Sequence, residues 1–533
     1  MLKVTLAQLN IKVGALKANR TAIVEAIEAA KKVGSHLVVF PELTVCGYPP
    51  EDLLYHQQFI EDCLNSLHEI AKATDGIAVV LGFPRFEQQL FNSAAFIQDG
   101  QIRLVYDKQK LPNYLVFDEK RYFSVGSNDG IIETTLNGQK LRLGITVCED
   151  IWYAAEPVMY QIDANVDMLI NISASPYAQG KIDERISMLQ GRSKKSGKPL
   201  IFCNLVGGQD ELIFDGTSCI FNKKAELIHQ SKSFHQDIQT IDLEATQHKH
   251  QSIELLDEIQ QAIVRGTRDY FYKNGFKKAV LGLSGGIDSA LCAALAVEAL
   301  GADHVTGLLM PSKYSSDHSI ADAQELADNL SIEHHILEIE PKHQAYANTL
   351  KKVLDDYYRN LTDENLQARI RGMLLMAWSN NHNALVLATG NKSEIAVGYC
   401  TLYGDMCGAY APIKDLFKNQ VYALAHHMNR DGILIPENTL IKPPSAELRP
   451  EQLDSDSLPD YDHLDEILTA YVHEFKDAEE IAALGFDIQL VRRILRLVDI
   501  NEYKRQQAAP GPRLTKMAFG KDRRMPMTNG YSS

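Results

Sequence analysis

A short apolar run that turns on two glycines and enters a helix constrains the fold of the second half of the chain. The run VLGLSGGIDSA (residues 280–290) has the pattern of a buried strand, a tight turn through Gly285 and Gly286, and a helix that starts near Ile287. Around it, strand-like and helix-like runs alternate, which is typical of a doubly wound parallel sheet. We therefore predict an α/β fold, with the glycine turn at the carboxyl end of a strand.

The neighbouring runs support this sheet. Helices are predicted over residues 253–274, 289–300 and around 366–381, and the first two end before Gly275 and Gly301. Strands are predicted over residues 277–284, 304–311 and 384–391. The final segment, KRQQAAPGPRLTKMAFGKDRRMP, is basic and interrupted by proline and glycine, so we expect a tail that docks on another surface rather than a helix.

The first half of the chain has a different pattern, with more strands and several hairpins. A helix is predicted from about Lys17 to Val33, between strand-like runs, and Asp99-Gly100 separates two further runs as in a hairpin. The polar segment EATQHKHQS lacks apolar periodicity. We therefore predict a domain over residues 1–243, a linker over 244–258, and a second domain over 259–533.

Composition and charge exclude several classes of protein. With 45% apolar and 23% charged residues the chain has the composition of a soluble globular protein. Its net charge of −15 argues against nucleic acid or an anionic membrane as partner. No apolar run approaches the ~18 residues of a membrane helix, and no signal peptide is evident. Eight scattered cysteines without a CxxC pair indicate reduced thiols, and hence a cytoplasmic location.

The glycine turn has the features of a phosphate-binding loop. Its backbone N–H groups and the helix N-terminus favour an anion, and Asp288 can hold a magnesium ion beside phosphates. The spacing matches neither GxxxxGK[ST] nor GxGxxG, which excludes the kinase-type loop and the dinucleotide fingerprint. The alternative is a glycine-rich turn without a ligand. A position at the carboxyl end of a strand, where open α/β sheets bind ligands, favours the binding loop.

Three reactive side chains in the first half follow three different strand-like runs. Cys148 ends the run LRLGITV, Glu42 follows HLVVFP, and Lys108 follows IRLVYD. A thiol needs a base or a cation beside it to act as a nucleophile. Lys110 is a rival for the lysine role, and a core thiol, a turn carboxylate and a surface lysine are the alternative for the set. Cys46, Cys203, Cys219 and Cys292 lie in apolar runs and are expected to be core residues.

The loop SGGIDS after a strand resembles that of the ATP pyrophosphatase family, whose members adenylate a substrate and release pyrophosphate. The runs ATGNKSEIAVGYCTLYGD, PIKDLFKNQVY and KPPSAELRP are similar to those of NAD synthetases within that family. The resemblance implies a Rossmann-like sheet and a site for ATP, deamido-NAD and Mg²⁺. The implied ATP-binding residues are Gly282, Leu283, Ser284, Gly285, Gly286, Ile287, Asp288, Ser289, Thr389, Lys418 and Ser445. Those implied for deamido-NAD are Asn365, Glu394 and Lys504, and those for Mg²⁺ are Asp288 and Glu394.

Glu42, Lys108 and Cys148, in that order along the chain, resemble the catalytic set of the nitrilase (carbon–nitrogen hydrolase) superfamily. The family pattern Lys-x-x-Leu fits Lys108 to Leu111 and so favours Lys108 over Lys110. The resemblance implies an α-β-β-α sandwich over most of residues 1–240. It also implies Glu42 as the base, Lys108 as the oxyanion stabiliser and Cys148 as the nucleophile. The implied glutamine-binding residues are Tyr114, Ser175 and Lys181.

Together the two resemblances indicate a ligase of NAD biosynthesis in which glutamine hydrolysis supplies ammonia for the amidation of adenylated deamido-NAD. They imply small-molecule substrates and a homo-oligomer formed through the synthetase half. Three alternatives stay open. In the first, the chain is a glutamine amidotransferase with a different acceptor. In the second, it is a nucleotide-binding module without turnover. In the third, it is a fusion whose first half hydrolyses another amide or a nitrile.

Overall fold

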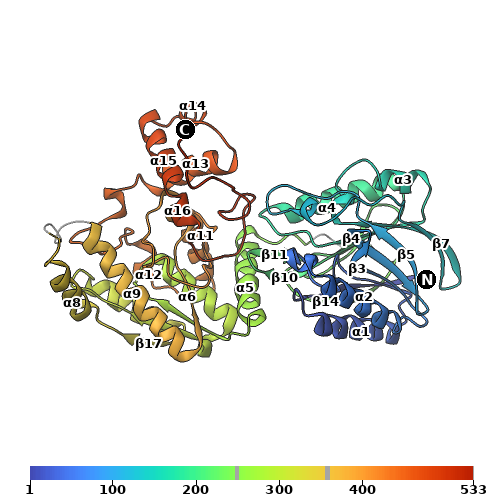
Figure 1. The fold of residues 1–533 in the computed structure, drawn as a ribbon, viewed down its shortest axis with the longest axis horizontal. Coiled ribbons are helices and arrows are strands. Elements are labelled where there is room, and N and C mark those ends of the chain that lie inside the picture. Colours follow the sequence, from blue (N-terminus) through green and yellow to red (C-terminus); the bar gives the residue numbers. More distant parts are fainter. Residues whose placement is uncertain (247–250, 355–360, 532–533) are drawn as a thin grey trace. The chain divides into compact units, whose positions relative to one another are not determined.

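The computed structural model describes residues 1–246, 251–354 and 361–531, and it consists of two compact units, Met1–Leu255 and Leu256–Ser533 (Figure 1). Each unit has its own sheets and its own core. Among the described residues, no helix combines the length and the apolar character that crossing a membrane requires.

The first unit is built on two six-stranded mixed sheets. One has the order β14-β1-β2-β3-β4-β5 and the other the order β13-β12-β9-β8-β7-β6. The strands of the first sheet are β1 (Lys3–Gln8), β2 (Leu37–Val39), β3 (Ala78–Glu87), β4 (Gln89–Gln98), β5 (Gln101–Asp107) and β14 (Asp237–Asp242). Those of the second are β6 (Ile131–Leu136), β7 (Gln139–Val147), β8 (Met168–Ser173), β9 (Leu200–Asn204), β12 (Cys219–Phe221) and β13 (Leu227–Gln230). A separate hairpin pairs β10 (Val206–Gln209) with β11 (Leu212–Asp215).

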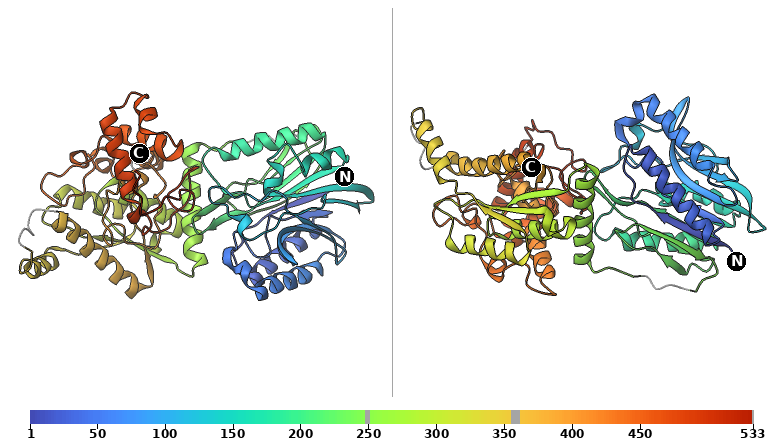
Figure 2. Two further views of the ribbon diagram at one scale, coloured as in Figure 1. Left: turned by 45° about the horizontal axis from the view of Figure 1, so that its top comes forward. Right: turned by 90° about the horizontal axis from the view of Figure 1, so that it is seen from below.

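Helices cover the outer face of each sheet, which gives the predicted α-β-β-α sandwich (Figure 2, left). The helices are α1 (Leu16–Lys32) and α2 (Gln57–Ala71) on the first sheet, and α3 (Val158–Asp163) and α4 (Lys181–Ser196) on the second. The alternation of side chains along the strands explains the layers. Val79 packs among the residues of α1 and α2, whereas Val80 packs with Ile170 in the core between the sheets. The predicted hairpin at Asp99-Gly100 is confirmed, since both residues have positive φ between β4 and β5.

The second unit contains a four-stranded parallel sheet, β17-β16-β15-β18, as predicted. Its strands are β15 (Lys278–Gly282), β16 (Val305–Leu309), β17 (Glu333–Ile336) and β18 (Ala384–Val386). Its helices are α5 (Leu255–Lys273), α6 (Ile287–Leu300), α7 (Asp317–Asn329), α8 (Glu340–Leu350), α9 (Leu361–His382), α10 (Lys392–Val397), α11 (Lys418–Met428), α12 (Glu437–Ile441), α13 (Tyr461–Leu468), α14 (Ala478–Ala482), α15 (Ile488–Ile500) and α16 (Glu502–Arg505). Strand β15 has β16 on one side and β18 on the other, so the strand order reverses at the end of β15. Ligands of open α/β sheets bind at such a point.

The predicted linker differs in part from the structure. Residues 247–250 lie outside the described part of the chain, and helix α5 already begins at Leu255, inside the range predicted as linker. Ile259, Ala262 and Ile263 belong to the buried stripe of this helix, in agreement with the helix predicted over residues 253–274.

The basic tail docks on its own unit. The Asp415 carboxylate accepts the N–H groups of Leu514 at 2.8 Å and Thr515 at 2.7 Å, and the ammonium of buried Lys392 donates to the Met517 carbonyl at 2.7 Å. The expectation of no helix is wrong at its start, because α16 (Glu502–Arg505) includes Lys504. From residue 506 to residue 531 the tail contains no α-helix.

The contact between β3 and the turn after β2 yields a prediction about stability. A Cβ atom at Gly82 would lie 2.1 Å from the Leu43 nitrogen and 2.8 Å from the Glu42 Cα. Gly82→Ala should therefore lower the free energy of unfolding by about 1–3 kcal/mol, the usual cost of overpacking. Gly191→Ala in α4, where an added Cβ meets nothing within 4 Å, is the control and should raise it by about 0.5–1 kcal/mol. Urea unfolding measures both; equal stability of Gly82→Ala and the parent contradicts the packing described.

Candidate active sites

Cys148 is the first residue of a tight turn at the end of β7. This 3-10 turn spans Cys148–Ile151, and the cysteine has a φ of +46° and is 3% exposed. A left-handed conformation costs a non-glycine residue about 1–3 kcal/mol and is found at functional sites. Burial and the charge of Glu42 raise the pKa of the Cys148 thiol well above its usual range, although Lys108 opposes them. The resting thiol is therefore protonated and needs a base to act as a nucleophile.

Glu42 and Lys108 form an ion pair beside this turn. Their side chains are fully buried, and the Lys108 Nζ donates to Glu42 Oε1 at 2.7 Å. Asn92 Nδ2 donates to the same oxygen at 2.7 Å, and the N–H of Ala174 donates to Glu42 Oε2 at 2.8 Å. Burial alone would lower the pKa of Lys108, but the charges of Glu119 and Glu42 outweigh it and hold that pKa well above its usual range. Lys108 therefore stays charged, and these contacts fix the orientation of the Glu42 side chain.

Glu119 is a member of this site that the sequence analysis missed. The Lys108 Nζ also donates to Glu119 Oε1 at 2.7 Å, and the Tyr48 hydroxyl donates to that oxygen at 2.9 Å. Burial, opposed by the charge of Lys108, raises the pKa of Glu119 to about 7. The only signal in the sequence is a carboxylate within the aromatic run LPNYLVFDEKRYF. Of the two candidate lysines, Lys108 contacts Glu42, whereas the backbone N–H of Lys110 binds Asp150.

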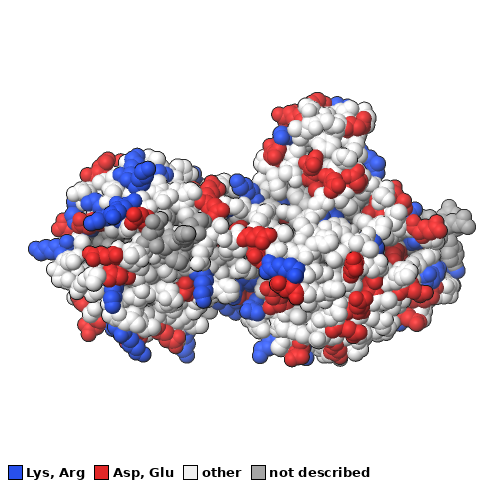
Figure 3. Space-filling view, turned by 180° about the vertical axis from the view of Figure 1, so that it is seen from behind, with Lys and Arg blue, Asp and Glu red and all other residues white. Residues whose placement is uncertain are grey.

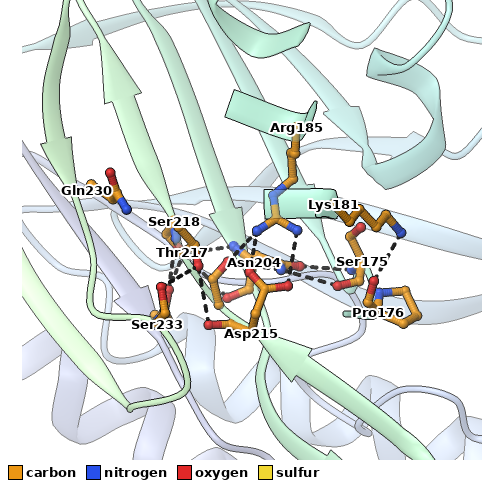
Figure 4. Close-up of polar contacts among 12 residues, drawn as sticks. Ser175, Pro176, Lys181, Arg185, Asn204, Asp215, Thr217, Ser218, Gln230 and Ser233 are labelled. Atoms are coloured by element: carbon orange, nitrogen blue, oxygen red, sulfur yellow. Dashed lines mark hydrogen bonds and ion pairs between the residues drawn. The ribbon is translucent and has the colours of Figure 1, made fainter. Parts of the chain in front are cut away.

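Two of the predicted glutamine-binding residues, Ser175 and Lys181, follow Ala174, whose N–H binds Glu42, and they lie near each other (Figure 4). Ser175 is 2% exposed, and its N–H donates to Asn204 Oδ1 at 2.8 Å. The Lys181 Nζ donates to the carbonyl of Pro176, the residue after Ser175, at 3.0 Å. Tyr114 comes from another segment, and its hydroxyl donates at 2.9 Å to Oε1 of Glu149, the residue after Cys148. The structure thus connects Tyr114 to the cysteine turn, and Lys181 to Pro176, the neighbour of Ser175.

A buried ion pair anchors helix α4, which carries Lys181. Arg185 lies one helical turn after Lys181, is fully buried, and makes a two-point contact with the Asp215 carboxylate (Figure 4). The Asn204 side-chain amide links the carbonyls of Ser175 and Gly216, at 3.3 and 3.0 Å. Ser175 and the start of α4 are therefore held to the β11–β12 connection rather than left mobile.

The second unit has a cavity of about 320 Å³ at the end of β15. All the predicted ATP-binding residues except Gly285 line it: Gly282, Leu283, Ser284, Gly286, Ile287, Asp288, Ser289, Thr389, Lys418 and Ser445. Gly285 shapes the loop, because its φ is +76° and an added Cβ would lie 2.3 Å from the Ser319 carbonyl oxygen. Ser284 and Ser289 are joined through their hydroxyls at 3.1 Å, which closes the turn.

An ammonium and two carboxylates line this cavity together. The Lys418 Nζ donates to Asp288 Oδ2 at 2.6 Å and to Glu394 Oε1 at 3.1 Å. Burial and the charge of Asp288 raise the pKa of Glu394 to about 8, although Lys418 opposes them. No cluster of three or more metal-binding side chains is present in the described ranges. Two carboxylates nevertheless suit Mg²⁺, which protein sites hold through one or two carboxylates together with water and substrate phosphates.

The other two residues predicted to bind deamido-NAD lie at the edge of the cavity. Asn365 Oδ1 accepts the hydroxyl of Thr401, a cavity-lining residue, at 2.8 Å. The Lys504 Nζ donates to the carbonyls of Gly398 and Cys400, at 2.7 and 2.8 Å. Both residues therefore contact the segment 398–401, whereas Glu394 lines the cavity itself.

Comparison with known proteins assigns each half of the chain to a family. The carbon-nitrogen hydrolase family matches residues 3–250, and the NAD synthase family matches residues 259–508. A glutamine-dependent NAD(+) synthetase of Thermotoga maritima is 43% identical, over 99% of this chain and 99% of the relative. The protein of the same name from Synechocystis is 44% identical, over 100% and 99%. The solved structure of a glutamine-dependent NAD+ synthetase from Acinetobacter baumannii in complex with ADP covers 100% of this chain and 99% of its own, with 40% identity and a TM-score of 0.80.

Identity above 40% along the whole chain, together with a match to both domain families, leaves one assignment. The chain belongs to the family of glutamine-dependent NAD(+) synthetases.

Proposed function

We propose that this protein makes NAD from deamido-NAD, ATP, glutamine and water, and releases AMP, pyrophosphate and glutamate. The observation that carries the proposal is the presence in one chain of two complementary sites. One is a cysteine turn beside a buried Glu42–Lys108 pair, and the other is a phosphate loop whose cavity also contains Lys418. Omitting ATP, Mg²⁺, glutamine or deamido-NAD in turn, with NAD and AMP assayed, tests the whole reaction.

Glutamine hydrolysis follows from the first site. Glu42 takes the thiol proton of Cys148 while Sγ attacks the side-chain amide carbon, and the C–N bond then breaks as the proton passes to the departing nitrogen. Ammonia leaves, and water activated by Glu42 cleaves the thioester to glutamate. An ammonium has three N–H donors, and Lys108 uses two of them on Glu42 and Glu119. The third, together with backbone N–H groups after Cys148, stabilises the oxyanion.

Recognition of glutamine is assigned to the side chains around the cysteine turn. The Glu149 carboxylate, which already accepts from Tyr114, has the charge to bind the α-ammonium group of the amino acid. Lys181 has the opposite charge and is suited to the α-carboxylate. The backbone N–H of Ser175 is held by Asn204, and its hydroxyl is assigned to complete these contacts.

Adenylation and amidation are assigned to the second site. The nicotinate carboxylate of deamido-NAD attacks the α-phosphorus of ATP, the bond to pyrophosphate breaks, and ammonia then displaces AMP from the acyl carbon. Ser284, Ser289 and the loop N–H groups hold the phosphates, while Lys418 neutralises charge on the departing pyrophosphate. Asp288 and Glu394 would hold Mg²⁺, which supplies further neutralisation of the phosphate charge when bound.

The remaining assignments concern partners and location. Asn365 and Lys504 are proposed to contact deamido-NAD at the edge of the cavity, and a homo-oligomer is proposed to form through the synthetase unit. Acidic and basic side chains are interspersed over the face shown in Figure 3, which suits small-molecule substrates better than nucleic acid. A cytoplasmic location is proposed because all eight cysteines are free thiols.

Replacing the nucleophile should separate the two nitrogen sources. Cys148→Ala is expected to abolish NAD formation from glutamine and to leave formation from ammonium chloride within about twofold, because the thiol supplies only ammonia. NAD is assayed with each nitrogen donor in turn. Loss of both activities in a folded variant contradicts the two-site proposal.

The two lysines after β5 provide a matched pair of variants. Lys108→Ala should lower the glutaminase rate by about 10²–10³-fold, the usual effect of removing one oxyanion donor. Lys110→Ala should have little effect, since Lys108 is the lysine bound to both Glu42 and Glu119. Glutamate release measures the rates, and ammonia-dependent synthesis checks the fold of the other unit. A larger loss of glutaminase rate in Lys110→Ala than in Lys108→Ala would show that Lys108 is the wrong lysine.

Removing the loop carboxylate should affect both nitrogen donors equally. Asp288→Ala is expected to lower NAD synthesis from glutamine and from ammonia by at least about 10²-fold, because it removes a phosphate-side metal ligand and a partner of Lys418. Exposed Asp303, at the other end of α6, provides the control Asp303→Ala. Near-normal ammonia-dependent synthesis in Asp288→Ala is the result that contradicts the assignment.

A further inference from the structure

Asp150 is a fully buried carboxylate in the cysteine turn, and neither the reaction nor the sequence analysis assigns it a role. Its Oδ1 accepts the backbone N–H groups of Gln109 at 3.1 Å and Lys110 at 2.8 Å. Its Oδ2 accepts the Tyr106 hydroxyl at 2.8 Å and the N–H of Val147 at 3.0 Å. One side chain therefore satisfies four donors from two separate segments.

The two segments carry two of the three catalytic groups. Gln109 and Lys110 directly follow Lys108, after β5, and Val147 directly precedes Cys148, at the end of β7. Lys108 is held to β4 by its own N–H, which donates to the Asn92 carbonyl at 2.9 Å. Asp150 holds the residues after Lys108 to the turn that presents the thiol. The distance from the ammonium to the oxyanion formed at Cys148 therefore depends on this carboxylate.

The chemistry of the contacts requires an ionised carboxylate. An amide of the same shape has one acceptor oxygen, and its NH₂ group would face two donors instead of accepting from them. Burial raises the pKa of Asp150 to about 6, and the N–H groups of Val147 and Lys110 oppose this shift. At pH 7 to 8 the group is therefore mainly ionised, and both oxygens accept. The backbone of Cys148 also needs such contacts, because its φ of +46° is a conformation that persists only when neighbouring contacts fix it.

We propose that Asp150 is a positioning residue for glutamine hydrolysis, which holds the Lys108 loop and the Cys148 turn in the relative placement that the oxyanion requires. It acts through these two residues and not by contact with glutamine. The inference rests on the proposed roles of Cys148 and Lys108.

The test compares two aspartates that hold backbone N–H groups of the same strand. Asp150→Asn is measured against Asp167→Asn, because Asp167 Oδ2 accepts the N–H of Arg142 at 2.8 Å, far from Cys148 along β7. Both full-length variants are assayed for glutamate release. The fraction of Cys148 that reacts with iodoacetamide is quantified by peptide mass spectrometry, so that kcat is expressed per reactive cysteine. Ammonia-dependent NAD synthesis reports on the other unit.

We expect kcat per reactive Cys148 to fall by roughly 10–10²-fold in Asp150→Asn, the effect of a small misplacement of catalytic groups, with KM for glutamine changed less than threefold. Asp167→Asn should keep the parental kcat. A purely structural role predicts a lower reactive fraction with a normal kcat per reactive cysteine, and that result overturns the proposal.

If Asp150→Asn does not fold, Asp150→Glu keeps the charge and moves the carboxylate by one methylene. A kcat within twofold of the parent in that variant overturns the proposal as well. Retained glutaminase activity in Cys148→Ala, by contrast, would overturn the proposed function itself.

Discussion

The first active site depends on one buried ammonium group shared by two carboxylates. Lys108 lies between Glu42 and Glu119 at 2.7 Å from each, with no exposure of its own side chain. Removing one member of a buried ion pair costs about 3–5 kcal/mol, because it leaves an uncompensated charge in a medium of low polarity. Three buried groups that depend on one another in this way must be presented by rigid elements. The first sheet provides two of them, since Glu42 follows β2, which pairs with β1 and β3, and Lys108 follows the edge strand β5, which pairs with β4.

The second unit uses a similar arrangement for a different purpose. Lys418 also joins two carboxylates, Asp288 and Glu394, but these retain 19% and 17% side-chain exposure and line a cavity. An ammonium that borders a cavity can exchange a carboxylate for a phosphate oxygen without being left unpaired. In the first unit Lys108 is fully buried between its two carboxylates, which suits the fixed donor role proposed for it. In the proposed reaction, the Lys108 ion pairs would stay fixed while they stabilise an oxyanion in one geometry. Those of Lys418 would exchange a carboxylate for a phosphate oxygen as substrates enter and leave.

How much the sequence predicts depends on whether the signal is local. The SGGIDS loop, the strand that precedes it and the Asp99-Gly100 hairpin each depend on a few adjacent residues, and the structure has them where they were predicted. Glu42, Lys108 and Cys148 are more than 100 residues apart at their extremes, and only the resemblance to a known order connected them. Glu119 and Asp150 carried no such signal. Their places in the site depend on contacts with other segments of the chain, which no single-residue pattern encodes.

Burial does not distinguish the proposed nucleophile from the other cysteines. Burial raises the pKa of Cys203, a core thiol of β9, to about 12, and it raises the pKa of Cys148 in the same direction. What differs is the surroundings: Cys203 donates to a backbone carbonyl in a regular strand, whereas Cys148 has a left-handed backbone and charged neighbours.

A thiol with a raised pKa is a poor nucleophile at rest, which also protects it from oxidation. Such a thiol reacts only when a base accepts its proton as the new bond forms. The buried carboxylate of Glu42, oriented on both oxygens before any substrate is present, fits that requirement.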